Sequence, residues 1–170
     1  MAVEKKISEL TAKSTELQPL DLLEVSEWNG ATYDTKSISG SGFILSTKVS
    51  LSAAQIKTAN SVPVSLISAP GAGKAIEVIS ASVNFQYGSV AFDSGSTAFE
   101  LKINTASTRQ FIASGYLNGT SSVFALMGVN SAITTQLVAN EPLNFVLSGA
   151  DATVGDSTID LYINYRIITL

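Results

Sequence analysis

Cysteine and histidine are both absent from the 170 residues of this sequence. Without cysteine the chain has no thiolate nucleophile, no disulfide and no soft-metal site, and without histidine it lacks the triads and acid–base pairs built on imidazole. The same two absences exclude zinc centres, because carboxylates alone rarely hold that ion. The composition therefore predicts a protein that is not an enzyme, that carries no cofactor, and whose stability comes from burial or assembly.

Charge and long apolar runs are also scarce. Charged residues make up 14% of the chain, the formal net charge is -4, and no basic cluster extends beyond Lys5 and Lys6. A nucleic-acid-binding protein would carry a basic patch, which is missing here. No run reaches the roughly 18 apolar residues of a membrane span, and the polar opening segment lacks the apolar stretch of a secretory signal. We therefore expect no nucleic-acid partner, no membrane insertion and no signal peptide.

The N-terminal part predicts a small module of a helix and a hairpin. Val3, Ile7 and Leu10 have helical spacing, and Pro19 prevents that helix from continuing. Two strand-like runs follow, 20–28 and 31–38, separated by Asn-Gly, which favours a type I′ hairpin turn. Because two strands alone make a marginal sheet, this module is expected to dock on something else.

A second stretch predicts how the module is joined to the rest. Residues 39–42, Ser-Gly-Ser-Gly, are equally compatible with a flexible joint and with a simple turn. Ser52 lies three residues before Gln55, which is capping-box spacing and predicts a short helix over 53–59 that ends before Pro63. We divide the chain into an N-terminal attachment module, 1–45, and a displayed domain, 46–170.

From residue 64 onward the pattern predicts short β-strands. Apolar residues alternate with polar ones in three clear runs, and about eight such segments are separated by turn signals every ten or so residues. This predicts an all-β fold, an antiparallel β-sandwich or jelly-roll-like domain. The alternating apolar positions are Ile79, Ala81, Val83, Phe85, Tyr87; Phe99, Leu101, Ile103; and Ile159, Leu161, Ile163, Tyr165, Ile167. Further candidate strands are 111–116, 122–129, 132–138 and 143–147.

The polar faces of these predicted strands are uncharged for the most part. Serine and threonine together hold 39 positions, whereas a monomeric sandwich usually protects its outer face with lysine and glutamate. A polar, uncharged face can be buried against a copy of itself without leaving a charged group buried and unpaired, which favours homo-oligomerisation. The alternative is an ordinary solvated face that happens to be rich in serine and threonine.

Two glycine-containing motifs are better explained as turns than as binding sites. Gly71-Ala72-Gly73-Lys74 resembles the end of a phosphate-binding loop, but Ser68 and Ala75 stand where the pattern needs glycine and a hydroxyl residue. A β-turn between strands is favoured there. The glycosylation sequon at Asn118 is likewise interpreted as a hairpin turn.

Acidic and aromatic residues of this sequence are better explained by structural roles than by catalytic or binding sites. Asp151, Asp156 and Asp160 miss the calcium-loop spacing, so no metal site is predicted. A glycosidase would need two facing carboxylates, and the pattern does not select a pair. Trp28, beside the hairpin turn, is better explained by packing than by stacking on a sugar. The carboxylates on or beside strands are Glu77, Asp93, Glu100 and Asp160.

Several segments resemble a known family. Residues 6–12, 17–25 and 29–38 are similar to the N-terminal segment of tailed-bacteriophage fibre and virion structural proteins: a Lys-Ile-Ser-x-Leu opening, an Asp-Leu-Leu-x-Val strand, and a glycine hairpin that closes on Thr-Lys-x-Ile. Residues 63–81 resemble the opening of a β-sandwich in phage virion proteins, and 156–168 resemble its last strand.

The resemblance implies a virion component, usually a homotrimer, attached to the particle by its N-terminal part. Because the chain is short and has no repetitive shaft, a head fibre or capsid decoration protein is favoured, and the expected partners are two further copies and a capsid or other virion protein. The alternative is a receptor-binding tail fibre or tail-tip protein that recognises bacterial surface glycans. The expected location is the particle surface, after synthesis in the host cytoplasm. The anchor candidates are Ile7, Leu10, Leu17, Leu22, Leu23 and Val25.

Overall fold

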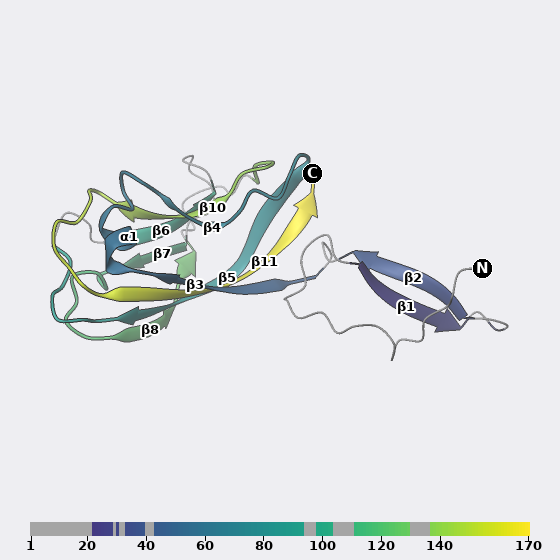
Figure 1. The fold of residues 1–170 in the computed structure, drawn as a ribbon, viewed down its shortest axis with the longest axis horizontal. Coiled ribbons are helices and arrows are strands. Elements are labelled where there is room, and N and C mark those ends of the chain that lie inside the picture. Colours follow the sequence, from purple (N-terminus) through teal and green to yellow (C-terminus); the bar gives the residue numbers. More distant parts are fainter. Residues whose placement is uncertain are drawn as a thin grey trace. The chain divides into compact units, whose positions relative to one another are not determined.

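A computed structural model describes residues 22–28, 30, 33–39, 43–93, 98–103, 111–129 and 137–170. The chain divides into two compact units, Met1–Gly40 and Ser41–Leu170, and each is described by itself (Figure 1). The helix expected within 3–15 lies outside the described residues. The division into an attachment module, 1–45, and a displayed domain, 46–170, stays a prediction.

The described part of the first unit is an antiparallel β-hairpin, as the sequence predicts. Strand β1 (Leu22–Trp28) pairs with β2 (Tyr33–Ser39), from Leu22 opposite Ser39 to Trp28 opposite Tyr33. Trp28 pairs with Tyr33 and not with Ala31, as a two-residue Asn-Gly turn would require, so the predicted register is wrong, and the turn itself lies largely outside the described residues. Gly30 does have a positive φ, 96°.

The second unit is a β-sandwich of two antiparallel sheets, which confirms the predicted all-β sandwich (Figure 1). Within the described residues, one sheet has the strand order β4-β10-β6-β7-β9 and the other has the order β3-β11-β5-β8. The elements are β3 (Leu45–Leu51), α1 (Ala53–Lys57), β4 (Val64–Ile67), β5 (Lys74–Gln86), β6 (Ala98–Ile103), β7 (Phe111–Ser114), β8 (Val123–Leu126), β9 (Gly128–Val129), β10 (Leu143–Ser148) and β11 (Thr158–Thr169).

The core lies between the two sheets and is built from alternate residues of their strands. Because successive side chains of a strand point to opposite faces, each strand contributes every second residue to the core. Phe99 on β6 and Phe145 on β10 pack with ring centroids 5.1 Å apart. The predicted apolar runs in β6 and β11 are confirmed as core, except that Tyr165 is only partly buried. Fully buried large side chains include Phe85, Phe99, Phe145, Leu51, Leu101, Leu143, Leu147, Ile159 and Leu161.

In β5 the predicted alternation fails at one residue. Opposite β5, Asn164 pairs with Ser80 and the next residue of β11 pairs with Val78, so Ile79 is an extra, unpaired residue, a β-bulge. A bulge reverses which residues point inward. Val78 is therefore buried, and Ile79, which the alternation assigned to the apolar face, is 42% exposed.

Three further expectations are corrected by the sheet topology. Residues 45–51 form β3, which the sequence analysis did not predict, although Leu45 and Leu51 are buried at its ends. The segment 122–129 is not one strand, because β8 joins the sheet of β5 and β9 joins the sheet of β7. The strand expected over 132–138 lies almost wholly outside the described residues.

The two glycine motifs are turns. Between β4 and β5, Gly71 and Gly73 have φ of 98° and 70°, and the Lys74 N–H donates to the carbonyl of Gly71 at 3.2 Å, as expected for a β-turn. At the sequon, the Gly119 N–H donates to the Tyr116 carbonyl at 3.0 Å, which confirms a turn. It is not a hairpin turn, because β7 and β8 belong to different sheets.

The short helix α1 begins where the capping box predicted. The Gln55 N–H donates to Ser52 Oγ at 3.3 Å, and the Ser52 N–H donates to Gln55 Oε1 at 3.0 Å. Ile56 is its buried residue. After the helix, Asp151 accepts hydrogen bonds from the backbone N–H groups of Asn60 and Ser61, at 2.9 and 3.0 Å, which ties this end of the helix to the loop before β11.

Candidate functional site

Among the described residues, the outer face of the sheet β3-β11-β5-β8 carries a connected set of side-chain interactions between strands. We call this surface the outer face. The registers place residues from different strands in rows across it: Tyr162 lies opposite Lys48 and Ser82, and Asp160 lies opposite Ser50 and Asn84. Its members are Ser46, Lys48, Ser50, Glu77, Ser80, Ser82, Asn84, Gln86, Phe124, Leu126, Thr158, Asp160, Tyr162, Asn164 and Arg166.

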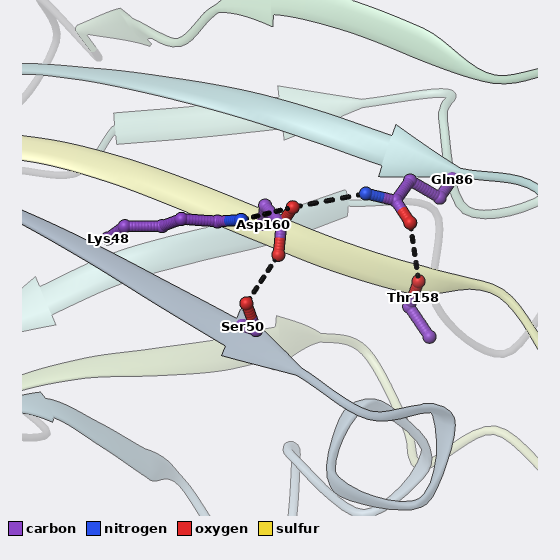
Figure 2. A network of polar contacts seen from close by, with 5 residues as sticks. All are labelled: Lys48, Ser50, Gln86, Thr158 and Asp160. Atoms are coloured by element: carbon purple, nitrogen blue, oxygen red, sulfur yellow. Dashed lines mark hydrogen bonds and ion pairs between the residues drawn. The ribbon is translucent and has the colours of Figure 1, made fainter.

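Asp160 is the centre of the polar network on this face, which Figure 2 shows. Ser50 Oγ donates to Asp160 Oδ1 at 2.5 Å, and Gln86 Nε2 donates to Oδ2 at 3.0 Å. The Lys48 ammonium lies 2.9 Å from the same Oδ2. Thr158 Oγ1 in turn donates to the Gln86 amide oxygen at 3.3 Å. Strands β3, β11 and β5 are thus connected through one carboxylate.

This network stabilises the charged forms of its acid and its base. The hydrogen bond from Ser50, together with the nearby Lys48 ammonium, lowers the pKa of Asp160 below its ordinary value. The hydrogen bond to Asp160 raises the pKa of Lys48. Both groups therefore remain charged and paired near neutral pH. A carboxylate held in this way is a poor general acid, because it does not carry a proton at that pH.

A second row of contacts lies further along the same strands. Ser46 Oγ donates to Asn164 Oδ1 at 2.6 Å, and Asn164 Nδ2 donates to Ser80 Oγ at 2.9 Å. Beyond it, the Arg166 guanidinium forms an ion pair with Glu77. Asn164 and Ser80, which the sequence placed on polar strand faces, are therefore bonded to each other across the sheet.

One corner of the outer face is apolar. Phe124 and Leu126 on the edge strand β8 are 67% and 82% exposed. The Phe124 ring packs edge-on against Tyr162, with centroids 6.0 Å apart, and Lys48 Nζ lies 5.6 Å from the centroid of the Tyr162 ring. We call Phe124, Leu126 and Tyr162 the apolar corner.

Sequence reasoning missed this corner, although a signal was present. The segment 122–129 was interpreted as a strand without an assignment of its faces. The large residues Phe124 and Leu126 share one phase of the alternation, whereas the other phase holds the smaller Val123 and Ala125, both only partly exposed. A strand whose larger apolar residues point away from the core indicates a surface that contacts something else.

The carboxylates considered as catalytic or metal-binding candidates lie at separate places, each with its own partner. Asp93 accepts hydrogen bonds from Thr153, and Asp156 accepts them from the N–H groups of Ser89 and Val90. These bonds lower the pKa of both carboxyls. Both carboxylates therefore have a structural role: each joins two loops that are far apart in sequence. A Cβ at Gly88 would overlap the Asp156 carboxylate, so this contact requires glycine there.

The remaining carboxylates are ion-paired or hydrogen-bonded in the same way. Glu100 lies on β6, in the other sheet, 2.8 Å from the Lys102 ammonium. Glu77 and Asp160 are on the outer face with their own cations. No group of three acidic side chains that could hold a metal ion occurs among the described residues.

The structure describes half of the anchor candidates, and only by their backbone. Leu22, Leu23 and Val25 lie on β1, in register with Ser39, Ile38 and Lys36. The other three, Ile7, Leu10 and Leu17, lie outside the described residues, and so does the side chain of Trp28. Attachment through these residues stays a prediction.

Comparisons with known proteins give no family for this chain. No protein-family model matches it, no curated protein matches its sequence, and no solved structure matches its fold. Within the described part of the chain, no helix has the length and apolar character that crossing a membrane requires.

Proposed function

We propose that this chain is a non-enzymatic structural protein of a tailed-bacteriophage particle, a homotrimeric head fibre or capsid decoration protein that attaches through its N-terminal segment. The sandwich is proposed to be jelly-roll-like, since β3, β5, β8 and β11 belong to one sheet and the strands between them in sequence to the other. The protein is placed on the particle surface, with a capsid or other virion protein as its partner.

The observation that carries the homo-oligomeric part is the pairing of charges within the outer face. Lys48 pairs with Asp160 and Arg166 pairs with Glu77, so the face presents neutral pairs and hydroxyl and amide groups. Such a surface can be covered by a copy of itself without like-charge repulsion. A monomeric sandwich would more often expose unpaired charges there.

The attachment part is supported by the organisation of the chain. The unit Met1–Gly40 is separate from the sandwich unit, and its described part is only the hairpin β1-β2. A two-stranded hairpin is marginally stable alone and gains stability by docking. The sequence resemblance of this segment to virion attachment segments supports the same role.

Deletion of residues 1–40 tests the attachment. Because the sandwich unit has its own core, we expect the shortened protein to keep its circular-dichroism spectrum and its oligomeric mass while it no longer decorates particles in a co-sedimentation assay. A variant with Leu23→Asp and Val25→Asp in the full chain should also lose decoration. Undiminished binding by the deleted protein would contradict the anchor assignment.

The alternative, a receptor-binding tail fibre or tail-tip protein that recognises surface glycans, is favoured by one observation. Phe124 and Tyr162 are exposed aromatic residues on a sheet face with hydroxyl and amide groups beside them, and sugars stack on such rings. Immunogold labelling separates the two candidates, since the first expects signal over the head and the second over the tail. Polysaccharide that gains reducing ends on incubation with the protein would contradict both.

A further inference from the structure

We propose that the outer face is the surface through which copies of this chain associate, with Phe124 and Leu126 of each copy meeting their counterparts around the symmetry axis. This inference rests on the proposed homo-oligomeric function and adds the surface and residues that the sequence does not supply. In a cyclic oligomer, residues close to the axis meet the same residues of the other copies.

The apolar corner supplies the part of this surface that gains most from being covered. On the neighbouring strand β5, Val83 and Phe85 are fully buried in the core, whereas Phe124 and Leu126 remain 67% and 82% exposed. They lie on β8, which is the edge strand of its sheet among the described strands, and their side chains are exposed, so a copy can reach them. Aromatic residues of this kind are typical anchors at the centre of protein interfaces.

The polar part of the outer face is compatible with burial because its groups are already bonded. Asp160 has partners in Ser50, Gln86 and Lys48, and Asn164 bonds to a serine on each side. Covering such groups leaves few donors or acceptors without a partner, which is the main cost of burying polar atoms.

Charge selects a second copy over other occupants. Each of the two ion pairs on the face joins one cation to one anion, so the face as a whole is close to neutral. A nucleic acid or a charged partner would find no opposite charge on it, whereas a copy brings the same neutral pairs. The ring of Tyr162, which belongs to the apolar corner, lies 5.6 Å from Lys48 Nζ, so the corner borders this ion pair.

The size of the face limits the area that such a contact can bury. The four strands β3, β11, β5 and β8 contain 36 residues, as their bounds give. At about 3.3 Å by 4.8 Å for each strand residue, the face covers roughly 570 Å². In the proposed homotrimer each copy divides its face between two neighbours, so the three faces together bury at most roughly 1,700 Å², and the apolar corner at the axis must supply much of the free energy of association.

Single-cysteine variants of the full-length protein provide a direct test, because the chain has no cysteine of its own. We expect Leu126→Cys to form covalent dimers on oxidation with copper-phenanthroline, seen in non-reducing gels at low micromolar protein. The matched control is Val62→Cys, since Val62 is 63% exposed but lies between α1 and β4, away from the outer face. Equal cross-linking of both variants, or of neither, would overturn the assigned surface.

A substitution test measures the contribution of the corner to association. The double variant Phe124→Ser and Leu126→Ser should weaken self-association at least about tenfold in sedimentation analysis, as expected for interface anchors. Its circular-dichroism spectrum should stay unchanged, because both side chains are exposed in the single copy. Val62→Ser is the control and should associate like the unmodified protein.

The outcomes separate this inference from the proposed function. If the unmodified protein is an oligomer and the double variant has the same mass over the same concentrations, the assigned surface is wrong and the homo-oligomeric function stands. If the unmodified protein sediments as a single copy at micromolar concentration, both are wrong. Glycan-array binding that the double variant loses at unchanged mass would also overturn this inference and favour the alternative function.

Discussion

The two faces of the sheet β3-β11-β5-β8 are made by alternate residues of the same strands, yet their side chains make different kinds of interaction. On the inner face, Phe85, Ile159 and Leu161 have no exposed surface and pack against the second sheet. On the outer face, Asp160 and Tyr162 interact with side chains of neighbouring strands. The inner face stabilises the fold by burial, whereas the outer face satisfies its polar groups laterally and keeps its apolar corner exposed.

This difference shows how one sheet can serve two purposes. Burial of apolar area supplies most of the free energy of folding, and that is concentrated on the inner face. Substitutions on the outer face should therefore have small effects on the free energy of unfolding, except at Asp160, whose carboxylate connects three strands. The apolar corner is then free to serve association without being needed for folding.

The sharpest test of the comparison is a matched pair of phenylalanines. Phe85→Ala removes a fully buried ring from the inner face and should lower the free energy of unfolding by about 3–5 kcal/mol, from the lost burial and the cavity that remains. Phe124→Ala, on the outer face, should change the free energy of unfolding of the single copy by no more than about 0.5 kcal/mol, at a protein concentration too low for association. Urea denaturation followed by circular dichroism measures both values. Similar losses for the two variants would show that the faces do not differ in this way.

Neighbouring residues at the bulge give the next largest contrast. Val78→Ser places a hydroxyl at a site that is 4% exposed and should cost about 2–3 kcal/mol. Ile79→Ser, one residue further, should cost no more than about 0.5 kcal/mol because the bulge points this side chain outward. The same denaturation assay applies. A reversed order of the two losses would mean that β5 continues its alternation without a bulge.

Asp160 should be the outer-face residue with the largest effect on stability. Asp160→Ala leaves Ser50, Gln86 and Lys48 without their shared acceptor and should lower the free energy of unfolding by about 1–3 kcal/mol. The control is Arg166→Ala, which breaks the more exposed ion pair with Glu77 and should cost less than about 1 kcal/mol. An equal or larger loss in the control would contradict the central place of Asp160.

The smallest expected effect is a dependence of stability on acid pH that passes through the same carboxylate. The pKa of Asp160 is lower in the folded chain than the roughly 3.9 of an unfolded aspartate, so its contribution is present above that value. It is lost as the pH falls through the folded pKa. Asp160→Asn should therefore lose less stability between pH 7 and pH 3 than the unmodified protein, measured by urea denaturation at both values.

Part of the acid dependence should remain in that variant. Hydrogen bonds in the loops also lower the pKa values of Asp93, Asp151 and Asp156, and these carboxylates titrate in the same direction. If Asp160→Asn and the unmodified protein lose the same stability on acidification, Asp160 is not held as an ion in the folded state.

The sequence by itself determined the all-β class, the hairpin at β1-β2 and the capping box at Ser52. It also determined which residues of β6 and β11 point into the core. These features depend on neighbours in the chain: period-two alternation, turn residues and cap spacing act over a few residues. The same local information identified polar, uncharged strand faces, and these led to the prediction that copies of the chain associate.

Tertiary structure alone decided the pairing of the strands and what it brings together. The bulge at Ile79 exists only because β11 pairs on both sides of it, and the assignment of β8 and β9 to different sheets depends on contacts far away in sequence. Asp160 acquires its partners from strands more than seventy residues away. The apolar corner likewise forms only when β8 becomes an edge strand, since exposure is a property of the whole fold and not of a local pattern.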